Sequence, residues 1–313
     1  MANRAFRAPI RLLSLFFASI LLYYCLRSFL ISSTSPSISS SDLLFKHLVV
    51  ASLKSDNTSW VGEHLPDWQA KVYVADDPKA QLTVPLNKGR ESMVYLTYII
   101  DHYNHLPDYM VFIHGLRYQW HNDDPIYDGV PILRNLRLPY VKSVGYAPLR
   151  CTWVPGCPAE LHPLNPTEKG LPTRVAAERA YASAFKTLLP NESVPKEVGA
   201  TCSSQFAVTR ERVRRRRKSD YERMRRWLMN TDLEDEISGR IMEYAWHIIM
   251  GMPPVYCPPA GECYCITFGI CKLNCNAARC DKRYVLPTYA QIPNGWPEHG
   301  GGENGWPTPG WNE

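Results

Sequence analysis

The stretch NKGRESMVYLTYIIDHYNHLPDYMVFIHGLRYQWHNDD, residues 87–124, decides the fold that we predict for this chain. A Leu-Pro-Asp break at 106–108 divides it, and the apolar run Tyr109–Ile113 behind the break predicts a short buried strand. Ahead of the break, residues at helical spacing predict an amphipathic helix over 91–105, with an apolar face made of Leu96, Ile99, Ile100 and Tyr103. A cluster of His, Asn and Asp ends the stretch.

Two more apolar runs precede this unit and predict strands, His47–Leu53 and Lys71–Ala75. Strand and helix in alternation predict an α/β fold with a mostly parallel central sheet and flanking helices. In such sheets ligands bind beyond the carboxyl ends of the strands. We therefore expect Asp76, Asp77 and His114 to lie at one rim.

The amino end has a membrane-directed segment. Residues 12–31 form a 20-residue apolar stretch broken only by Arg27, and three arginines precede it. A cleaved signal peptide and an uncleaved anchor are both compatible with this pattern; the length and the lack of an A-x-A cleavage box favour an anchor. We expect a cytosolic end (1–11), a single transmembrane helix (12–31) and a Ser-rich stalk (32–43).

With this orientation, the rest of the chain faces the lumen of the Golgi or endoplasmic reticulum, or the cell surface. We divide it into an α/β domain (44–254), a cysteine-rich segment (255–284) and a disordered tail rich in Pro, Gly and Trp (285–313). A hydrophobic content of 45% in 313 residues suffices for a core. Asn57 and Asn191 begin glycosylation sequons, which agrees with the secretory pathway.

Nine cysteines follow the apolar segment, and six of them lie between Cys257 and Cys280. No CxxC pair occurs among these six, so disulfides are favoured over a zinc module. Cys151 and Cys157, six apart in a Pro-Gly loop, predict a small disulfide-closed loop. Nine cysteines cannot all pair internally, so one is left over.

A basic run, RERVRRRRK, occupies residues 210–218. It suits either a surface for anionic lipid or polyanion, or a solvated face of a basic helix. A net charge of +5 is modest for this length, and we expect no nucleic-acid partner.

The start of the helix over 91–105 is a candidate phosphate site. A helix amino terminus offers free N–H groups and partial positive charge, to which basic side chains beside Gly89 would add. The alternative is an ordinary capped helix with solvated charges. The residues predicted to bind a substrate are Asp76, Asn87, Lys88, Arg90, Glu91 and Trp120.

The acidic cluster that follows suits a divalent cation, Mn²⁺ or Mg²⁺, with His121, Asp123 and Asp124 as ligands; the alternative is a set of structural side chains. Glu243 and His114 are the candidate catalytic residues. Glu243 could act as a general base; the alternative is a surface or structural carboxylate. It lies one helical turn before His247, which would share its face if a helix spans 239–249.

The chain resembles a largely fungal family of domains of unknown function, domain of unknown function 3431. The resemblance covers about residues 44–296 and carries no catalytic residues over. It rests on NKGRE at 87–91, YLTYIIDHYNHLPD at 95–108, VFIHG at 111–115 with WHND at 120–123, RCTWVPGCP at 150–158 and EYAWHIIMG at 243–251.

A more distant likeness is to nucleotide-sugar glycosyltransferases of the A type. It rests on the strand and helix alternation, on SSQFAVTRERV at 203–213 and on the E-x-x-W spacing of Glu243 and Trp246. Such enzymes hold a metal and the sugar diphosphate with an Asp-x-Asp motif at a strand end, where this chain has Ile-His-Gly at 113–115. Asp123 and Asp124 replace that motif, or the enzyme needs no metal, or the fold has lost the activity.

The leading hypothesis is therefore a membrane-anchored, glycosyltransferase-like domain that binds a nucleotide sugar and a glycan acceptor. The alternatives are a cell-wall carbohydrate-binding module, in which Trp and Tyr residues stack on sugars, and a structural surface protein.

Overall fold

The computed structural model describes residue 20, residues 45–285 and residues 292 and 296. Apart from Ile20, the predicted anchor and stalk lie outside the described residues. In the part of the chain that is described, no helix is long and apolar enough to cross a membrane. Residues 1–44 and 45–313 form separate units, and the second contains the fold.

Five strands form one sheet in the order β2-β1-β3-β6-β4. The strands β1, β2 and β3 are parallel to one another, while β6 runs antiparallel to both β3 and β4. The expectation of a mostly parallel sheet is therefore wrong, and the sheet is mixed. In chain order the strands are β1 (Lys46–Ser52), β2 (Gln69–Val74), β3 (Tyr109–His114), β4 (Tyr146–Pro148) and β6 (Phe206–Thr209).

Both faces of the sheet are buried, which explains why its central strands are continuous apolar runs. In β1, Val49 belongs to the core on one face, while Leu48 and Val50 belong to the core on the other. In β3, Phe112 and Val111 divide in the same way. Helices must therefore cover each face.

The larger core packs around aromatic rings on one face. Tyr95 of the first helix on this face lies 4.9 Å from Phe112, and Phe206 lies 5.5 Å from Trp246, measured between ring centroids. The helices here are α3 (Glu91–His102), α6 (Pro172–Leu188), α8 (Lys218–Asn230), α9 (Asp235–Glu243) and α10 (Trp246–Ile249), with η2 (Tyr103–His105) extending α3 and α7 (Arg210–Val213) following β6.

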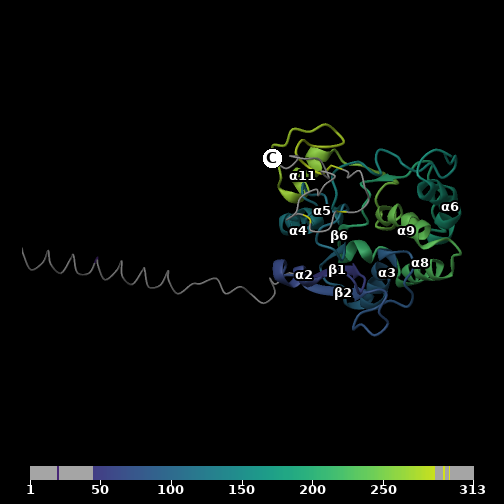
Figure 1. Cartoon of the computed structure of the whole chain (residues 1–313), viewed down its shortest axis with the longest axis horizontal. Helices are drawn as coiled ribbons and strands as arrows, with labels where there is room; N and C mark the ends of the chain where they lie inside the picture. Colours follow the sequence, from purple (N-terminus) through teal and green to yellow (C-terminus); the bar gives the residue numbers. More distant parts are fainter. Residues whose placement is uncertain (1–19, 21–44, 286–291, 293–295, 297–313) are drawn as a thin grey trace, which may run out of the picture. The chain divides into compact units, whose positions relative to one another are not determined.

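Shorter helices cover the other face, and Figure 1 shows them gathered away from α3, α6, α8 and α9. They are α2 (Ser59–His64), α4 (Gly129–Asn135), α5 (Leu138–Val144) and α11 (Ala260–Phe268). The sequence pattern of the proline-rich segment 124–170 did not predict α4, α5 or β4. Two further strands, β5 (Gly199–Ala200) and β7 (Val255–Tyr256), form a separate parallel pair.

The basic run is largely structural. Arg212, Arg214 and Arg216 donate to the carbonyls of Val144, Asn104 and Ile249, which lie in the last turns of α5, η2 and α10. Arg223 donates to the carbonyl of Leu188, the last residue of α6. The last carbonyls of a helix have no partner within the helix and carry partial negative charge. A guanidinium at this position donates hydrogen bonds to these carbonyls and compensates the charge.

The cysteine-rich segment is joined covalently to the α/β domain. The disulfides are Cys151–Cys263, Cys157–Cys257, Cys265–Cys271 and Cys275–Cys280. The expected use of the cysteines in disulfides is confirmed, but the expected loop between Cys151 and Cys157 is wrong, because each of the two pairs with a partner about a hundred residues later. Among the described residues, Cys202 is the unpaired cysteine, and it is buried.

Three residues of the predicted disordered tail are described, Val285, Ile292 and Trp296, and the last two pack on the domain. The indole N–H of Trp296 donates to the carbonyl of Ile126 at 2.7 Å, and the ring lies against Tyr127. Ile292 packs in the same small cluster. At these two positions the structure differs from the expectation of disorder.

Candidate functional site

A cleft of about 500 Å³ opens beyond the carboxyl ends of β1, β2 and β3. The strand register explains its position, because Ser52 pairs with Val74 and Ala51 pairs with His114, which brings the ends of the three strands together. The strand β1 also lies where the chain changes direction across the sheet, with β2 on one side and β3 on the other. Seven of the predicted site residues line the cleft: Asn87, Arg90, Glu91, His114, Trp120, His121 and Glu243.

Two of the carboxyl groups that line the cleft are shielded from solvent, and they come from different helices. Glu91 is the first residue of α3, and its side chain is 11% exposed. Burial raises its pKa, against the lowering effects of the nearby Ser204 hydroxyl and of the charge of Arg90. Glu243 ends α9, and burial also raises its pKa, partly offset by Arg240 and reinforced by the negative charge of Glu91. The pair is therefore arranged to hold protons at a higher pH than exposed glutamates.

Two histidines complete this polar region. The Nε2 atom of His114 lies 3.7 Å from an oxygen of Glu91, and the rings of His114 and His121 meet edge to face with centroids 4.3 Å apart. Burial lowers the pKa of His114 to about 4 and that of His121 well below its usual value. Both imidazoles are therefore neutral near pH 7, and the contact of His114 with Glu91 is not an ion pair.

The start of α3 already has an anionic partner. The carboxylate of Asp235 accepts hydrogen bonds from the amides of Gly89, at 2.5 Å, and Arg90, at 3.4 Å. The predicted use of these amides for a phosphate is therefore not available without moving Asp235. The guanidinium of Arg90 is half exposed at the cleft and pairs with Glu236 at 3.7 Å. Arg240 lines the same wall, so two cationic side chains face the cleft.

Two predicted substrate-binding residues do not line the cleft. Lys88 points away and donates to the carbonyl of Thr231. Asp76 follows Ala75, which does line the cleft, but the side chain of Asp76 is exposed and accepts a hydrogen bond from the amide of Lys54 at 2.7 Å. Asp76 therefore lies at the expected rim of the sheet, after the carboxyl end of β2, but its side chain turns away from the cleft.

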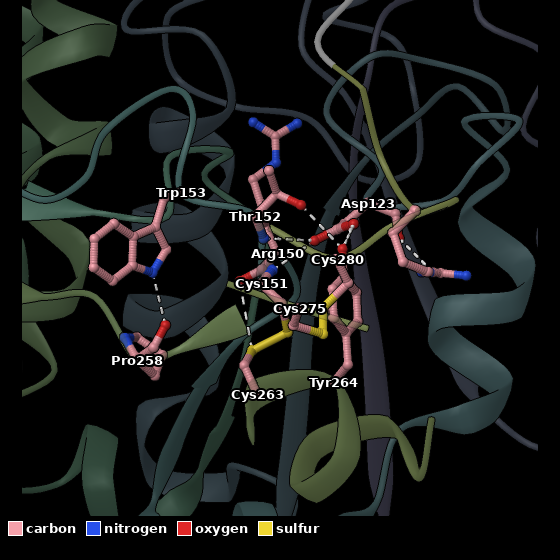
Figure 2. Close-up of a disulfide and its surroundings, with 11 residues drawn as sticks. Asp123, Arg150, Cys151, Thr152, Trp153, Pro258, Cys263, Tyr264, Cys275 and Cys280 are labelled. Carbon is pink, nitrogen blue, oxygen red and sulfur yellow. Dashed lines mark hydrogen bonds between the residues drawn. A yellow bond between two sulfur atoms is a disulfide. The ribbon is translucent and has the colours of Figure 1, made fainter. Parts of the chain in front are cut away.

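The predicted metal ligands are not brought together. Asp123 is fully buried and accepts from the amides of Cys151 and Thr152 at 2.6 and 3.0 Å, and from the hydroxyl of Tyr264 (Figure 2). These bonds occupy both of its oxygens. Asp124 accepts from the amide of Ile126 at 3.0 Å within its own loop. Only His121 of the three lines the cleft, and within the described ranges no group of three or more His, Cys, Asp or Glu is placed to hold a metal ion.

Glu243 and His247 do not share a face. The helix expected over 239–249 breaks at Tyr244 and Ala245, between α9 and α10. His247 is buried, and its Nε2 lies 2.9 Å from the carbonyl oxygen of Pro254. Only Glu243 reaches the cleft.

Sequence reasoning missed four residues that shape the site. Gln119 bonds to both histidines, Arg240 and Asp235 form part of one wall, and Arg150 lies behind Trp120. Arg150 is fully buried and donates to the carbonyls of Cys202 and Trp120 at 2.7 and 2.6 Å. The sequence did offer two signals, the arginine next to Cys151 and the acidic residues that follow α8, whereas nothing in the sequence around Gln119 marks it.

Residues 48–266 match the model of a family described as Protein of unknown function (DUF3431). The match covers the sheet, the cleft residues and the first half of the disulfide framework. No curated protein matches the chain, and no solved structure matches it either.

Proposed function

The chain belongs to the DUF3431 family, and we propose that its cleft is the site of a glycosyltransferase-like domain that binds a nucleotide sugar. One observation carries the proposal: Glu91, Glu243 and His114 converge at the carboxyl ends of three parallel strands in a cleft of about 500 Å³. Such a volume suits a small polar molecule, and paired buried carboxyls in a cleft are typical of sites that transfer protons.

Each part of the cleft has a role in this proposal. Transfer breaks the bond between the sugar's anomeric carbon and the diphosphate, and forms a bond from that carbon to an acceptor hydroxyl oxygen. Arg90 and Arg240 supply positive charge for the diphosphate that leaves. Trp120 lines the cleft with aromatic surface that a sugar or a base can contact.

Glu243 is the proposed general base that takes the proton of the acceptor hydroxyl. Its raised pKa brings it nearer to neutral pH, where a carboxylate is a better proton acceptor. Arg240 lies three positions earlier in α9 and favours the ionised form that the base needs. Burial also raises the pKa of Glu91, the second carboxyl group of this pair.

In the proposed transfer, no step uses a metal ion. The oxygens of Asp123 are committed to Cys151, Thr152 and Tyr264, so the predicted Mn²⁺ or Mg²⁺ ligands do not fit a bound ion. The experiment below nevertheless includes both ions, because a nucleotide diphosphate can bring a cation with it.

We further propose that the domain is anchored by residues 12–31 and faces the lumen or the cell surface. Four disulfides support this proposal, because they are favoured in oxidising compartments. Protease protection of the full chain in sealed microsomes tests the orientation: digestion of the α/β domain in intact vesicles contradicts it.

Calorimetric titration of the full chain with UDP- and GDP-sugars, with and without Mn²⁺ or Mg²⁺, tests the function. We expect binding to at least one donor, weakened about tenfold or more by Arg90→Ala, because a charge-assisted contact to phosphate is lost. Lys88→Ala is the matched control, since this neighbouring cation lies outside the cleft. A complete absence of binding to every donor refutes the proposal.

Glu243→Gln separates catalysis from binding. The amide keeps the shape of the side chain but accepts no proton, so we expect donor binding to persist and transfer to any acceptor to be lost. Transfer that survives this change removes Glu243 as the base.

A second candidate function is carbohydrate binding without catalysis. Trp120 favours it, because this ring lines the cleft and stacks beside His121 at a centroid distance of 4.0 Å. Glycan-array binding that needs no nucleotide, and that Trp120→Ala abolishes, would support this function over the first.

A further inference from the structure

Gln119 connects the two cleft histidines through a single oxygen atom. Its Oε1 lies 3.3 Å from Nδ1 of His114 and 3.2 Å from Nδ1 of His121. The residue is 8% exposed, so water does not compete freely for these contacts. It comes from the loop after β3, and its position is fixed by its own amide, which donates to the carbonyl of Tyr127 at 3.1 Å.

The orientation of the Gln119 side-chain amide follows from a third contact. Its Nε2 lies 2.8 Å from the carbonyl oxygen of Leu116, and a carbonyl oxygen can only accept. In the opposite orientation, Oε1 of Gln119 would face the carbonyl oxygen of Leu116, so that two acceptors would meet. Its NH₂ group would then face the histidines and would meet a second donor at any protonated Nδ1. The side-chain oxygen therefore faces the histidines.

An oxygen that only accepts requires a proton on each Nδ1. A neutral imidazole carries one proton, so its other nitrogen, Nε2, keeps a free lone pair. Burial lowers the pKa of both rings, to about 4 for His114, so neither ring gains a second proton near neutral pH. The Nε2 of His114 is buried and has no hydrogen-bond partner among the described residues.

We infer that Gln119 fixes His114 and His121, which both line the cleft, as Nδ1–H tautomers, so that each ring keeps its Nε2 as a hydrogen-bond acceptor for a hydroxyl group of a ligand. Gln119 is thus a positioning residue. That the hydroxyl groups belong to the sugar of a nucleotide sugar rests on the proposed function. The assignment of the two tautomers does not depend on it.

This arrangement divides the cleft by chemistry. The histidine side accepts hydrogen bonds and the two glutamates beside it also offer oxygens, so a group rich in O–H donors fits there. Phosphate oxygens are acceptors and would meet lone pairs at that side, whereas Arg90 and Arg240 offer donors on a wall that they share with Asp235 and Glu236. A nucleotide sugar would therefore bind in one direction, with its sugar towards His114.

Nitrogen-15 NMR of the full chain, labelled at its nine histidines, tests the tautomers directly. The two rings are assigned by the signals that disappear in His114→Asn and His121→Asn. We expect both wild-type rings to carry the proton on Nδ1 at about pH 7. An Nε2–H form at either ring overturns the inference, and this measurement needs no ligand.

Two variants at Gln119 test its role. Gln119→Met keeps the length of the side chain but removes the acceptor, so we expect loss of the Nδ1–H preference at both rings. Gln119→Glu keeps an acceptor and should preserve it. Gln81→Met, at an exposed position outside the cleft, is the matched control. If the tautomers do not change in Gln119→Met, Gln119 does not position the two rings. If that variant does not fold, the test rests on the wild-type and Gln119→Glu spectra, which must both show Nδ1–H at the two rings.

Binding completes the test. We expect Gln119→Met to weaken the wild-type chain's UDP-sugar or GDP-sugar complex about tenfold, the size of one lost hydrogen bond, and to leave the affinity for UDP or GDP alone unchanged. An equal loss for both ligands contradicts the acceptor role towards the sugar. If the wild type binds no nucleotide sugar, the proposed function fails while the NMR result stands.

Discussion

The carboxylate of Asp123 accepts a hydrogen bond from the hydroxyl of Tyr264, although 141 positions separate the two residues. The same carboxylate accepts from two amides of the segment 151–152, next to the disulfide between Cys151 and Cys263 (Figure 2). One buried side chain thus joins the loop after β3, the segment after β4 and the cysteine-rich end. Asp123 stabilises the frame behind the cleft instead of lining it.

Asp123→Asn should therefore destabilise the protein. An amide replaces one acceptor oxygen by a donor, which would face a backbone N–H or the Tyr264 hydroxyl, so we expect a loss of about 1–3 kcal/mol in the free energy of unfolding. Urea unfolding followed by fluorescence measures it. Asp232→Asn, at an exposed position, is the control. A variant of unchanged stability that loses a Mn²⁺ dependence of ligand binding shown by the wild type would return Asp123 to the role of a metal ligand.

Peptide mapping tests the two disulfides that join positions far apart in the sequence. Digestion without reduction should release linked peptides that contain Cys151 with Cys263 and Cys157 with Cys257. A peptide in which Cys151 is joined to Cys157 would contradict the structure.

Loop length predicts different effects of removing each bond. With Cys157–Cys257 intact, the bond between Cys151 and Cys263 closes a loop of only about 14 residues, made of 151–157 and 257–263, so replacing both cysteines by alanine should cost about 3 kcal/mol of stability. Cys275 and Cys280 are five positions apart, and the same change should cost about 2 kcal/mol. Equal losses in the two double variants would contradict the chain-entropy argument.

Cys202 should be unreactive in the folded protein. Burial raises its pKa well above the usual value, reinforced by the charge of Glu243, so the thiol stays protonated. We expect no alkylation of its peptide by iodoacetamide at about pH 8, and complete alkylation in urea. Fast labelling of the native chain at this peptide would mean that the wall behind Glu243 opens.

Gly89 lies at the close approach of α3 and α8. Its φ is +71°, and an added Cβ would lie 2.3 Å from Leu228. Gly89→Ala should therefore cost about 1–3 kcal/mol of stability. Gly62→Ala is the matched control, because nothing lies within 4 Å of its Cβ and it lies inside α2; there we expect a gain of roughly 0.5–1 kcal/mol. Equal effects at the two glycines would contradict this packing.

The sequence predicted the elements whose signals are local. The strands β1, β2 and β3 are apolar runs, and α3 with η2 covers the predicted helix over 91–105. The rim where ligands should bind followed from this alternation, and seven predicted residues do line the cleft. Strand direction was not predicted for β6, because four buried residues carry no signal of the direction in which they pair.

The errors share a physical cause, which is a partner far away in the sequence. Asp123 looks like a metal ligand until Tyr264 and the amides of 151–152 are known. The start of α3 looks like a phosphate site until Asp235, 146 positions later, reaches the amide of Gly89. The role of Gln119 depends on two imidazole rings and one carbonyl, and no spacing of residues reveals that geometry.

The buried histidine His247 gives stability a pH dependence with a definite sign. Burial lowers its pKa to about 4, against an ordinary value of 6.5. Between these values the unfolded chain binds the proton and the folded chain does not, so the free energy of unfolding falls as the pH falls from 6.5 towards about 4, and this contribution is fully present above 6.5. The raised pKa values of Glu91 and Glu243 act in the opposite direction.

His247→Gln isolates this contribution, because the glutamates titrate in both proteins and cancel in the difference. The amide of glutamine can still donate to the carbonyl of Pro254, as the Nε2–H of His247 does. We expect the stability of the wild type relative to the variant to be constant above about pH 7 and to fall by up to about 3 kcal/mol between pH 6.5 and 4, at about 1.4 kcal/mol per pH unit. Urea unfolding of both proteins across this range measures the difference. A difference that does not change with pH would show that the imidazole is protonated as readily in the folded chain as in the unfolded one. The structure does not allow this, because His247 is 1% exposed and its imidazole has a single carbonyl partner.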